Sequence, residues 1–366
     1  MVLWLIHKWN KDQNNAQQFQ SSNYKTKVSV LIAARNEEKN IKQCLELILA
    51  QDYPSSMFEV LVVDDQSDDY TPDIVEEIKD PRIKMMRLGV YKRTTIQGSK
   101  KKAIAYGVSH ATGDLIITTD ADCKVGPTWI STIVAAYEKQ SCTLMILPVE
   151  IIGDQSTLGI FQSLDSMSTF FIQKSAHDAG FFQLGSAANL AFERKVFLET
   201  DPYDDNMQIA SGDDMFLIKK INQQYKGTTL AVKSPATIVQ TIAVKSISDL
   251  FSQRLRWASK LKKAGSPSLM LSSAFVWWAK ILSFVAPIFL FFLGNQILFY
   301  SSLALLTLQM GLDFTILYKA SGFFHKRKLM WYFLPMEILY FFYLFILGIL
   351  SWLPFQLEWK DRMIKV

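Results

Sequence analysis

The chain has 366 residues, of which 49% are hydrophobic and 20% are charged, and its formal net charge is +5. This length allows two or three domains of ordinary size. The four histidines and three cysteines show no zinc-binding or CxxC spacing, which excludes the usual zinc and disulfide frameworks and favours a reducing compartment. The basic residues cluster beside apolar segments, so they indicate a membrane edge and no nucleic-acid partner.

Residues 1–27 are interpreted as an N-terminal anchor and linker. The segment 1–9 is apolar up to Lys8, which is shorter than a signal-peptide core of roughly 7–15 residues or a spanning helix of about 20. It is either a short interfacial anchor or the end of a span that begins outside this chain. Residues 13–27 are polar and aperiodic, which is typical of a linker.

Strand and helix patterns alternate from residue 28 onward. This alternation predicts an α/β domain with a mostly parallel sheet and helices on both faces. The predicted strands are 28–34, 58–65, 82–88 and 114–120, and the predicted helices are 37–51, 71–79, 100–111 and 127–139.

Polar residues gather where three of these strands end. Ligands bind beyond the carboxyl ends of strands in such sheets. We therefore expect three strand ends to bring polar groups to one edge. These groups are Arg35, Asn36 and Glu37 after the first strand, Asp64 and Asp65 after the second, and Asp120 and Asp122 after the fourth.

Asp120 and Asp122 are separated by one alanine, and their charges repel unless a cation joins them. A hard divalent cation takes one or two carboxylates and completes its coordination with water and substrate phosphates. We therefore predict Mg²⁺ or Mn²⁺ on Asp122, with Asp120 as a second ligand or a hydrogen-bonding partner of sugar hydroxyls. A helix cap and a solvated turn are the alternatives for this pair.

Three other readings lose support: a dinucleotide-binding fold, a P-loop and a phosphorelay receiver domain. Neither GxGxxG nor GxxxxGK[ST] occurs, and the "VVDDQSDD" segment ends the second predicted strand, whereas receiver domains of phosphorelays carry such a pair on the first. The "GSKKKA" segment, residues 98–103, is either a solvated basic turn or a site that attracts an anionic nucleotide, in which case Lys101 contacts the donor.

Three long apolar runs follow residue 267 and predict a region with two to three transmembrane helices, residues 267–366. Lysine and arginine on their flanks place the domain of residues 28–266 in the cytoplasm, and the membrane is expected to be a bacterial inner membrane. With three spans, the C-terminal tail would lie outside, although it is also basic. Alternatively, the first run is an interfacial helix that does not span the membrane, and the tail lies inside. The runs and their single charges are Leu269–Phe292 with Lys280, Leu298–Leu317 with Asp313, and Leu329–Leu353 with Glu337.

These residues resemble a membrane-bound family 2 glycosyltransferase with the GT-A fold, over residues 28–257. "VSVLIAARNEEKNI" resembles the nucleotide-binding first strand and loop of that family, "VVDDQSDD" its uracil-binding motif, and "TTDAD" its metal-binding motif. The resemblance also departs from the family, which often has glycine in place of Gln66. Residues assigned to the nucleotide-sugar are Ala34, Arg35, Glu37, Asp64, Asp65, Lys101, Asp120 and Arg256.

Later segments carry the remaining family motifs. "LGSAANLAFER" resembles the segment near the acceptor pocket, "ASGDD" lies where the family has its catalytic base, and "QRLRW" fits Gln-x-x-Arg-Trp. The resemblance implies that Asp214 is the base, with Asp213 as the alternative. A basic, aromatic membrane-edge helix is the alternative reading of "QRLRW". Residues assigned to the acceptor are Gly185, Ser186, Gln253 and Trp257.

The resemblance implies an inverting, metal-dependent transfer from a UDP-sugar. We expect a membrane lipid as acceptor, and a processive polysaccharide synthase with a glycan acceptor is the alternative. Outside glycosyl transfer, a metal-dependent nucleotidyltransferase and a non-catalytic membrane scaffold remain as rival functions.

Overall fold

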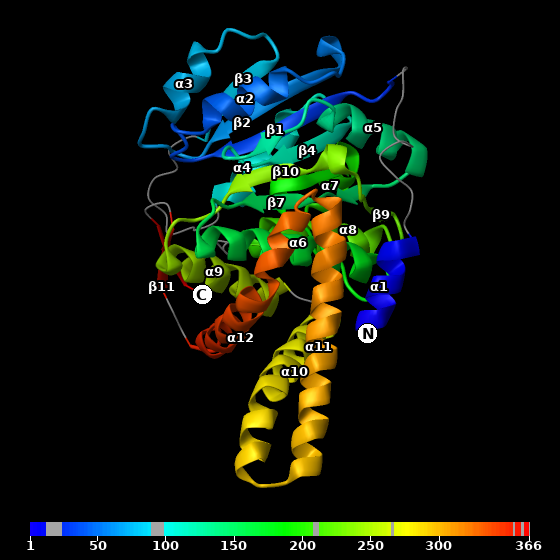
Figure 1. Cartoon of the computed structure of the whole chain (residues 1–366). Coiled ribbons are helices and arrows are strands. Elements are labelled where there is room, and N and C mark those ends of the chain that lie inside the picture. The colour runs from blue at the N-terminus through cyan, green and yellow to red at the C-terminus, as the bar shows by residue number, and fades with distance from the viewer. Residues whose placement is uncertain are drawn as a thin grey trace.

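A seven-stranded mixed sheet forms the centre of the upper part of the molecule in Figure 1, with strand order β3-β2-β1-β4-β8-β6-β9. The computed structural model describes residues 1–11, 24–88, 99–207, 212–264, 267–353, 356–359 and 362–365. The strands of this sheet are β1 (Val28–Ala34), β2 (Phe58–Asp64), β3 (Ile83–Arg87), β4 (Leu115–Thr119), β6 (Leu144–Ile146), β8 (Leu190–Glu193) and β9 (Thr229–Ala231).

A smaller three-stranded sheet has the order β5-β10-β7. It contains β5 (Lys124–Val125), β7 (Val149–Ile152) and β10 (Val239–Ile242). The helices around the sheets are α2 (Ile41–Leu49), α3 (Thr71–Glu77), α4 (Ser99–His110), α5 (Trp129–Gln140), α6 (Thr157–Asp178), α7 (Arg194–Thr200), α8 (Asp213–Gln224) and α9 (Ile247–Ala264).

The predicted α/β fold is confirmed. Strands β1 to β4 pair in parallel with their neighbours, while β8 runs antiparallel to both β4 and β6. Continuous apolar runs made these strands predictable, because both faces of the sheet are buried under helices. One boundary was wrong: the helix predicted over 37–51 starts at Ile41, because the backbone N–H groups of Glu37 and Glu38 donate instead to Thr71 (2.7 Å) and Asp69 (3.0 Å).

Glu59 on β2 is a buried carboxylate that joins three segments of the sheet. Its Oε1 accepts hydrogen bonds from Ser29 Oγ at 2.7 Å and from Thr112 N at 2.6 Å, and its Oε2 lies 2.7 Å from Lys84 Nζ. Burial alone raises the pKa of Glu59, but Lys84 and the hydroxyl and amide donors outweigh it and lower this pKa to about 2. The ionised form is therefore the one that the folded state stabilises.

Glu59→Gln is expected to lower the free energy of unfolding by about 2 kcal/mol at pH 7, because it removes charge-assisted hydrogen bonds in a buried site. The folded-state pKa is depressed, so this stabilisation is fully present above about pH 4.5 and is lost as the pH falls toward 2. Urea unfolding in detergent at pH 7 and pH 3 measures the difference. A destabilisation that grows on acidification would contradict this account of Glu59.

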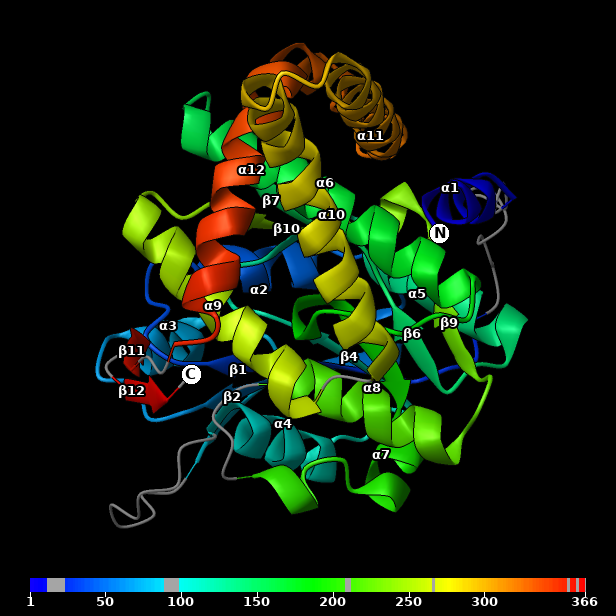
Figure 2. The ribbon, with the colours of Figure 1, turned by 90° about the horizontal axis from the view of Figure 1, so that it is seen from below.

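The C-terminal part contains three helices long and apolar enough to cross a membrane. They are α10 (Pro267–Phe292), α11 (Gln296–Phe323) and the segment 327–350, which consists of a 3₁₀ turn, η6 (Arg327–Tyr332), followed by α12 (Phe333–Leu350). Helices α10 and α11 form a long hairpin that leaves the sheet domain, and α12 packs against α9 and α10 (Figures 1 and 2). The proposed boundary at 266/267 lies between α9 and α10. A final β-hairpin, not predicted, comprises β11 (Gln356–Trp359) and β12 (Arg362–Lys365).

The N-terminal segment is a helix, α1 (Val2–Lys11), that packs on α6 and α11. Leu5 and Trp9 are its buried residues, and the Trp9 ring stacks on Phe171 of α6 with 4.6 Å between centroids. The anchoring of this segment to the membrane stays a prediction. The predicted linker, residues 13–27, lies mostly outside the described residues.

The single charged residues of the three apolar runs meet in one cluster. Lys280 Nζ of α10 lies 2.8 Å from Asp313 Oδ2 of α11 and forms an ion pair with Glu337 of α12, and Lys280 and Glu337 are buried. Charged side chains are rare in membrane-spanning helices, and they usually pair with an opposite charge. This triad therefore fixes how the three helices are placed relative to one another.

Lys280→Met is expected to destabilise the helices by about 3 kcal/mol, because two carboxylates then share an apolar environment without a counter-charge. The variant in which Lys280, Asp313 and Glu337 are all replaced by neutral residues should recover most of the loss. Thermal unfolding in detergent compares these variants with the wild type. Unchanged stability of Lys280→Met would show that the triad does not hold the helices.

Candidate active site

A cavity of about 500 Å³ lies beyond the carboxyl ends of β1, β2 and β4 and continues between α6, α8, α9 and α12. It therefore brings together residues separated by more than 200 positions in the sequence. The predicted site residues that line it are Ala34, Arg35, Glu37, Asp65, Asp120, Asp122, Gly185, Ser186, Asp213, Asp214, Gln253, Arg256 and Trp257. The other two predicted residues, Asp64 and Lys101, do not line it.

The loops after β1 and β2 are hydrogen-bonded to each other where they line the cavity. Arg35 Nη1 donates to the carbonyl oxygens of Asp65 (2.8 Å) and Gln66 (2.7 Å). Asp64 is buried, and its carboxylate accepts from Ser67 N, so it supports the turn that positions Asp65. Gln66 has a φ of +60°, a left-handed conformation that glycine adopts with less strain, which explains why glycine suits this position.

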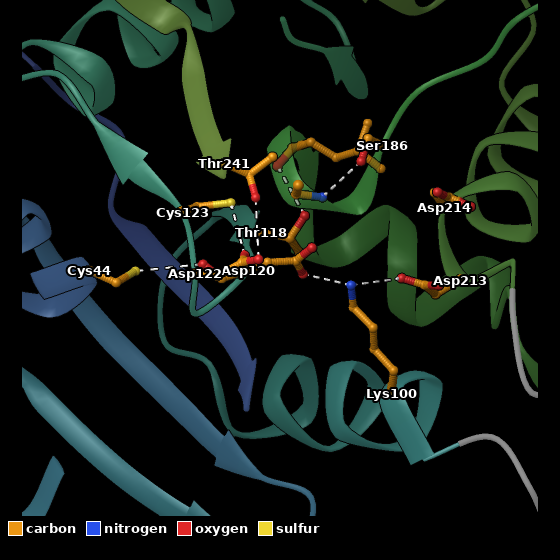
Figure 3. Close-up of polar contacts among 12 residues, drawn as sticks. Cys44, Lys100, Thr118, Asp120, Asp122, Cys123, Ser186, Asp213, Asp214 and Thr241 are labelled. Atoms are coloured by element: carbon orange, nitrogen blue, oxygen red, sulfur yellow. Dashed lines mark hydrogen bonds and ion pairs between the residues drawn. The ribbon is translucent and has the colours of Figure 1, made fainter. Parts of the chain in front are cut away.

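The cation beside the predicted carboxylates is Lys100. Its Nζ lies 2.6 Å from Asp120 Oδ1 and 3.5 Å from Asp213 Oδ2 (Figure 3). Lys101 instead points into the core, where its Nζ donates to Asn206 Oδ1 at 2.7 Å and lies over the Phe216 ring. Lys100 therefore lines the cavity and Lys101 does not, because adjacent residues of α4 point in directions about 100° apart.

Asp120 and Asp122 fit the ligand set of a small divalent cation. Asp122 Oδ2 accepts from Thr241 of β10 at 3.2 Å, and the carboxylate of Asp120 faces Lys100 (Figure 3). Across the described parts of the chain, no three His, Cys, Asp or Glu side chains converge to hold a metal. The protein thus offers one or two carboxylates, and Mg²⁺ or Mn²⁺ would obtain its remaining ligands from water and substrate phosphates.

The first turn of α8 carries two carboxylates that face different cations. Asp213 points toward Lys100, whereas Asp214 lies 3.1 Å from Lys260 Nζ of α9. Burial raises the pKa of Asp213, but the charges of Lys100, Lys260 and Arg256 outweigh burial and lower it to about 2. Gly212, with a φ of +92°, makes the turn into α8 that brings both aspartates to the cavity.

Helix α9 brings the "QRLRW" residues to the same cavity. Gln253, Arg256, Trp257 and Lys260 are spaced three and four apart, so they share one face of the helix. Burial lowers the pKa of Arg256, and the carboxylates of Asp213, Asp120 and Asp214 oppose this shift. The guanidinium is therefore a half-buried positive charge near the carboxylates of β4 and α8.

Sequence reasoning missed several polar residues that line the cavity, among them Lys100, Asp165, Thr241, Arg254 and Lys260. Lys260 continues the helical spacing of the "QRLRW" motif by one turn, and this signal could have found it. Asp165 and Thr241 carry no local signal, because only the tertiary structure brings α6 and β10 to the site.

A mixed sheet of this kind, with a carboxylate pair at a strand end and a second pair on a facing helix, defines a domain of the GT-A class. Among solved structures, the fold is similar to the mannosyltransferase PcManGT from Pyrobaculum calidifontis, solved in complex with GDP-Man and Mn²⁺. The TM-score is 0.54 at 17% sequence identity, and the match covers 93% of each chain. The predicted GT-A fold is therefore confirmed.

Residues 29–198 match the sequence profile of Glycosyl transferase family 2, so the chain contains a family 2 glycosyltransferase domain, as predicted. It is 26% identical over 204 residues to glycosyltransferase AglE of Haloferax volcanii, which covers 56% of this chain and 64% of that protein. It is 33% identical over 100 residues to a beta-monoglucosyldiacylglycerol synthase of Synechocystis, which covers 27% of this chain and 20% of that protein. The chain thus spans less than two thirds of the length of these curated relatives.

Proposed function

We propose that this protein transfers one sugar, with inversion, from a UDP-sugar to a membrane lipid at the cytoplasmic face of a bacterial inner membrane. The observation that carries the proposal is a single cavity that joins Asp122, Asp214 and Arg256 and extends to Tyr343 and Leu347 of the apolar helix α12. The residues proposed to bind the donor and the apolar residues proposed to face the lipid thus line one cavity.

The donor lies along the strand ends in this proposal. Asp65 hydrogen-bonds the uracil, and Arg35 holds the loop that carries Asp65. Arg256 and Lys100 contact the diphosphate, because a guanidinium and an ammonium bind phosphate oxygens through charge-assisted hydrogen bonds. Ala34 and Glu37 complete the nucleotide end of the cavity.

Asp122 and Asp120 hold the divalent cation. When bound, Mg²⁺ or Mn²⁺ would neutralise the charge that develops on the departing diphosphate. Arg256 stabilises the same charge from the opposite side of the cavity, and Lys100 keeps Asp120 paired until the donor arrives. The Mn²⁺ in the complex of the similar mannosyltransferase supports this choice of cation.

Asp214 is the general base that takes the proton of the acceptor hydroxyl. Asp213 is less suited, because its lowered pKa makes it a weak base and it faces Lys100, a proposed diphosphate contact on the donor side. Asp214 faces α9, which carries the acceptor-side residues Gln253 and Trp257. General-base assistance of this kind contributes about 10²–10⁴-fold to the rate.

A lipid acceptor is favoured over a growing polysaccharide. The three C-terminal helices contain few polar residues to line a channel for a glycan, and Tyr343 and Leu347 of α12 instead form an apolar wall of the cavity. The relative named beta-monoglucosyldiacylglycerol synthase supports a lipid substrate. The basic residues that flank the helices would hold the domain at the headgroups.

Incubation of the purified protein with Mn²⁺, a membrane lipid extract and a panel of UDP-sugars tests the proposal. We expect release of UDP and a glycolipid whose added mass identifies the sugar. GDP-mannose belongs in the panel, because the similar mannosyltransferase binds it. No nucleotide release would indicate a scaffold, pyrophosphate release a nucleotidyltransferase, and a polymeric product a polysaccharide synthase.

A further inference from the structure

The cavity is also lined by an ion pair that the proposed donor contacts do not use. Arg254 of α9 and Asp165 of α6 are both buried, and Arg254 Nη2 lies 2.7 Å from Asp165 Oδ2. The guanidinium carbon of Arg254 lies 4.3 Å from the centroid of the Trp257 ring, which fixes the plane of the guanidinium. Phe170 and Tyr343 line the same cavity.

Polar atoms at and near this ion pair lack hydrogen bonds. Arg254 is only 5% exposed, yet its Nε and Nη2 atoms have no hydrogen-bond partner among the described residues, and the same holds for the buried Oε1 of Gln253. Nη2 is thus held near Asp165 by charge, without an N–H directed at an acceptor. An unsatisfied buried polar group costs about 1–3 kcal/mol. Arg254 Nε and Gln253 Oε1, on one cavity wall, therefore indicate a ligand that supplies an oxygen atom and a hydroxyl group.

The charge of this wall restricts the ligand. Arg254 and Asp165 sum to zero, so a phosphate that contacts Arg254 would also meet the carboxylate of Asp165 in a medium of low dielectric constant. An uncharged headgroup avoids this repulsion, because its oxygen accepts from Arg254 while its hydroxyl donates to Asp165. Phe170, Tyr343 and Leu347 provide an apolar surface beside these groups for the start of an acyl chain.

We propose that Arg254 and Asp165 bind the uncharged headgroup of a lipid acceptor that carries several hydroxyls, as in a neutral glycolipid. This inference rests on the proposed function and adds the class of the acceptor. Arg254 donates to a headgroup oxygen, Asp165 accepts from a headgroup hydroxyl, and a second hydroxyl is left to approach Asp214.

Fractionation of a membrane lipid extract by anion exchange tests the class of acceptor. The neutral and the acidic fractions are each incubated with wild-type protein, Mn²⁺ and the radiolabelled donor from the panel. Label in lipid from the neutral fraction is expected. Label from the acidic fraction alone, or from neither fraction while UDP still binds in calorimetry, overturns the inference. Failure of UDP to bind at all instead overturns the proposed function.

Charge variants then test the two residues themselves. Asp165→Asn leaves the charge of Arg254 uncompensated, so the ratio of kcat/KM for monoglucosyl dioleoylglycerol to that for dioleoyl phosphatidylglycerol should fall at least about tenfold. Arg254→Gln should raise KM for monoglucosyl dioleoylglycerol about tenfold, with a smaller change in kcat and in UDP affinity. The double variant should restore most of the preference for the neutral lipid.

Arg87→Gln is the matched control, because Arg87 of β3 forms an exposed ion pair with Glu76 of α3 and neither residue lines the cavity. A merely structural role of the Arg254–Asp165 pair would lower the melting temperature and reduce turnover of both lipids equally. An unchanged lipid ratio in Asp165→Asn, with a wild-type melting temperature, would overturn the assignment.

Discussion

Asp214→Asn is expected to reduce kcat about 10²–10⁴-fold while the affinity for UDP stays within about threefold of the wild type. The amide cannot take a proton from the acceptor hydroxyl, but its size matches that of the carboxylate. Asp214 lies beside Lys260 on the acceptor side, whereas the proposed diphosphate contacts are Lys100 and Arg256. The measurements are steady-state transfer with the best donor of the panel and calorimetric titration of UDP with Mn²⁺.

The matched control is Asp249→Asn, because Asp249 is exposed in the first turn of α9. It should leave both kcat and UDP affinity unchanged. Asp213→Asn distinguishes the two adjacent aspartates, because it removes the carboxylate beside Lys100 and should weaken donor binding more than Asp214→Asn does. Normal turnover by Asp214→Asn, together with a collapse of kcat in Asp213→Asn, would transfer the role of base to Asp213.

Asp122→Ala is expected to lower kcat/KM by about a thousandfold, because stabilisation of the leaving group by a bound cation is worth several kcal/mol. The same variant should bind UDP with an affinity that no longer depends on Mn²⁺. Titration of UDP at several Mn²⁺ concentrations measures this dependence separately from catalysis.

Asp52→Ala is a suitable control, because Asp52 is an exposed residue after α2 that does not line the cavity. It should show the full Mn²⁺ dependence of UDP binding. A wild-type metal dependence in Asp122→Ala would show that Asp122 is not a ligand and that the cation, if required, binds elsewhere.

The parallel strands and the carboxylates at their ends could be predicted from the sequence. Strand β2 is apolar from Val60 to Val63 and ends at Asp64, so both the strand and its end are visible in the pattern. Because parallel strands end at one edge of the sheet, the convergence of Arg35, Asp65 and Asp122 followed from the topology alone. The "QRLRW" motif added Arg256 through resemblance.

The remaining parts of the site depend on contacts that a linear pattern does not contain. Three consecutive lysines open α4, and only the packing of the helix decides that Lys100 faces the cavity while Lys101 enters the core. Asp165 lies in a 22-residue helix without a motif, and its partner Arg254 comes from a distant segment. Similarly, the lone charge Lys280 was visible in the sequence, but its pairing across three helices was not.

A crystal structure of the protein with UDP and Mn²⁺ tests the central claim most directly, because anomalous scattering locates the manganese without ambiguity. The account predicts one manganese peak in contact with Asp122, with the diphosphate between this peak and Arg256 and the uracil beside Asp65. A manganese peak away from β4, or a nucleotide bound outside the cavity that joins Asp122 and Arg256, would contradict it.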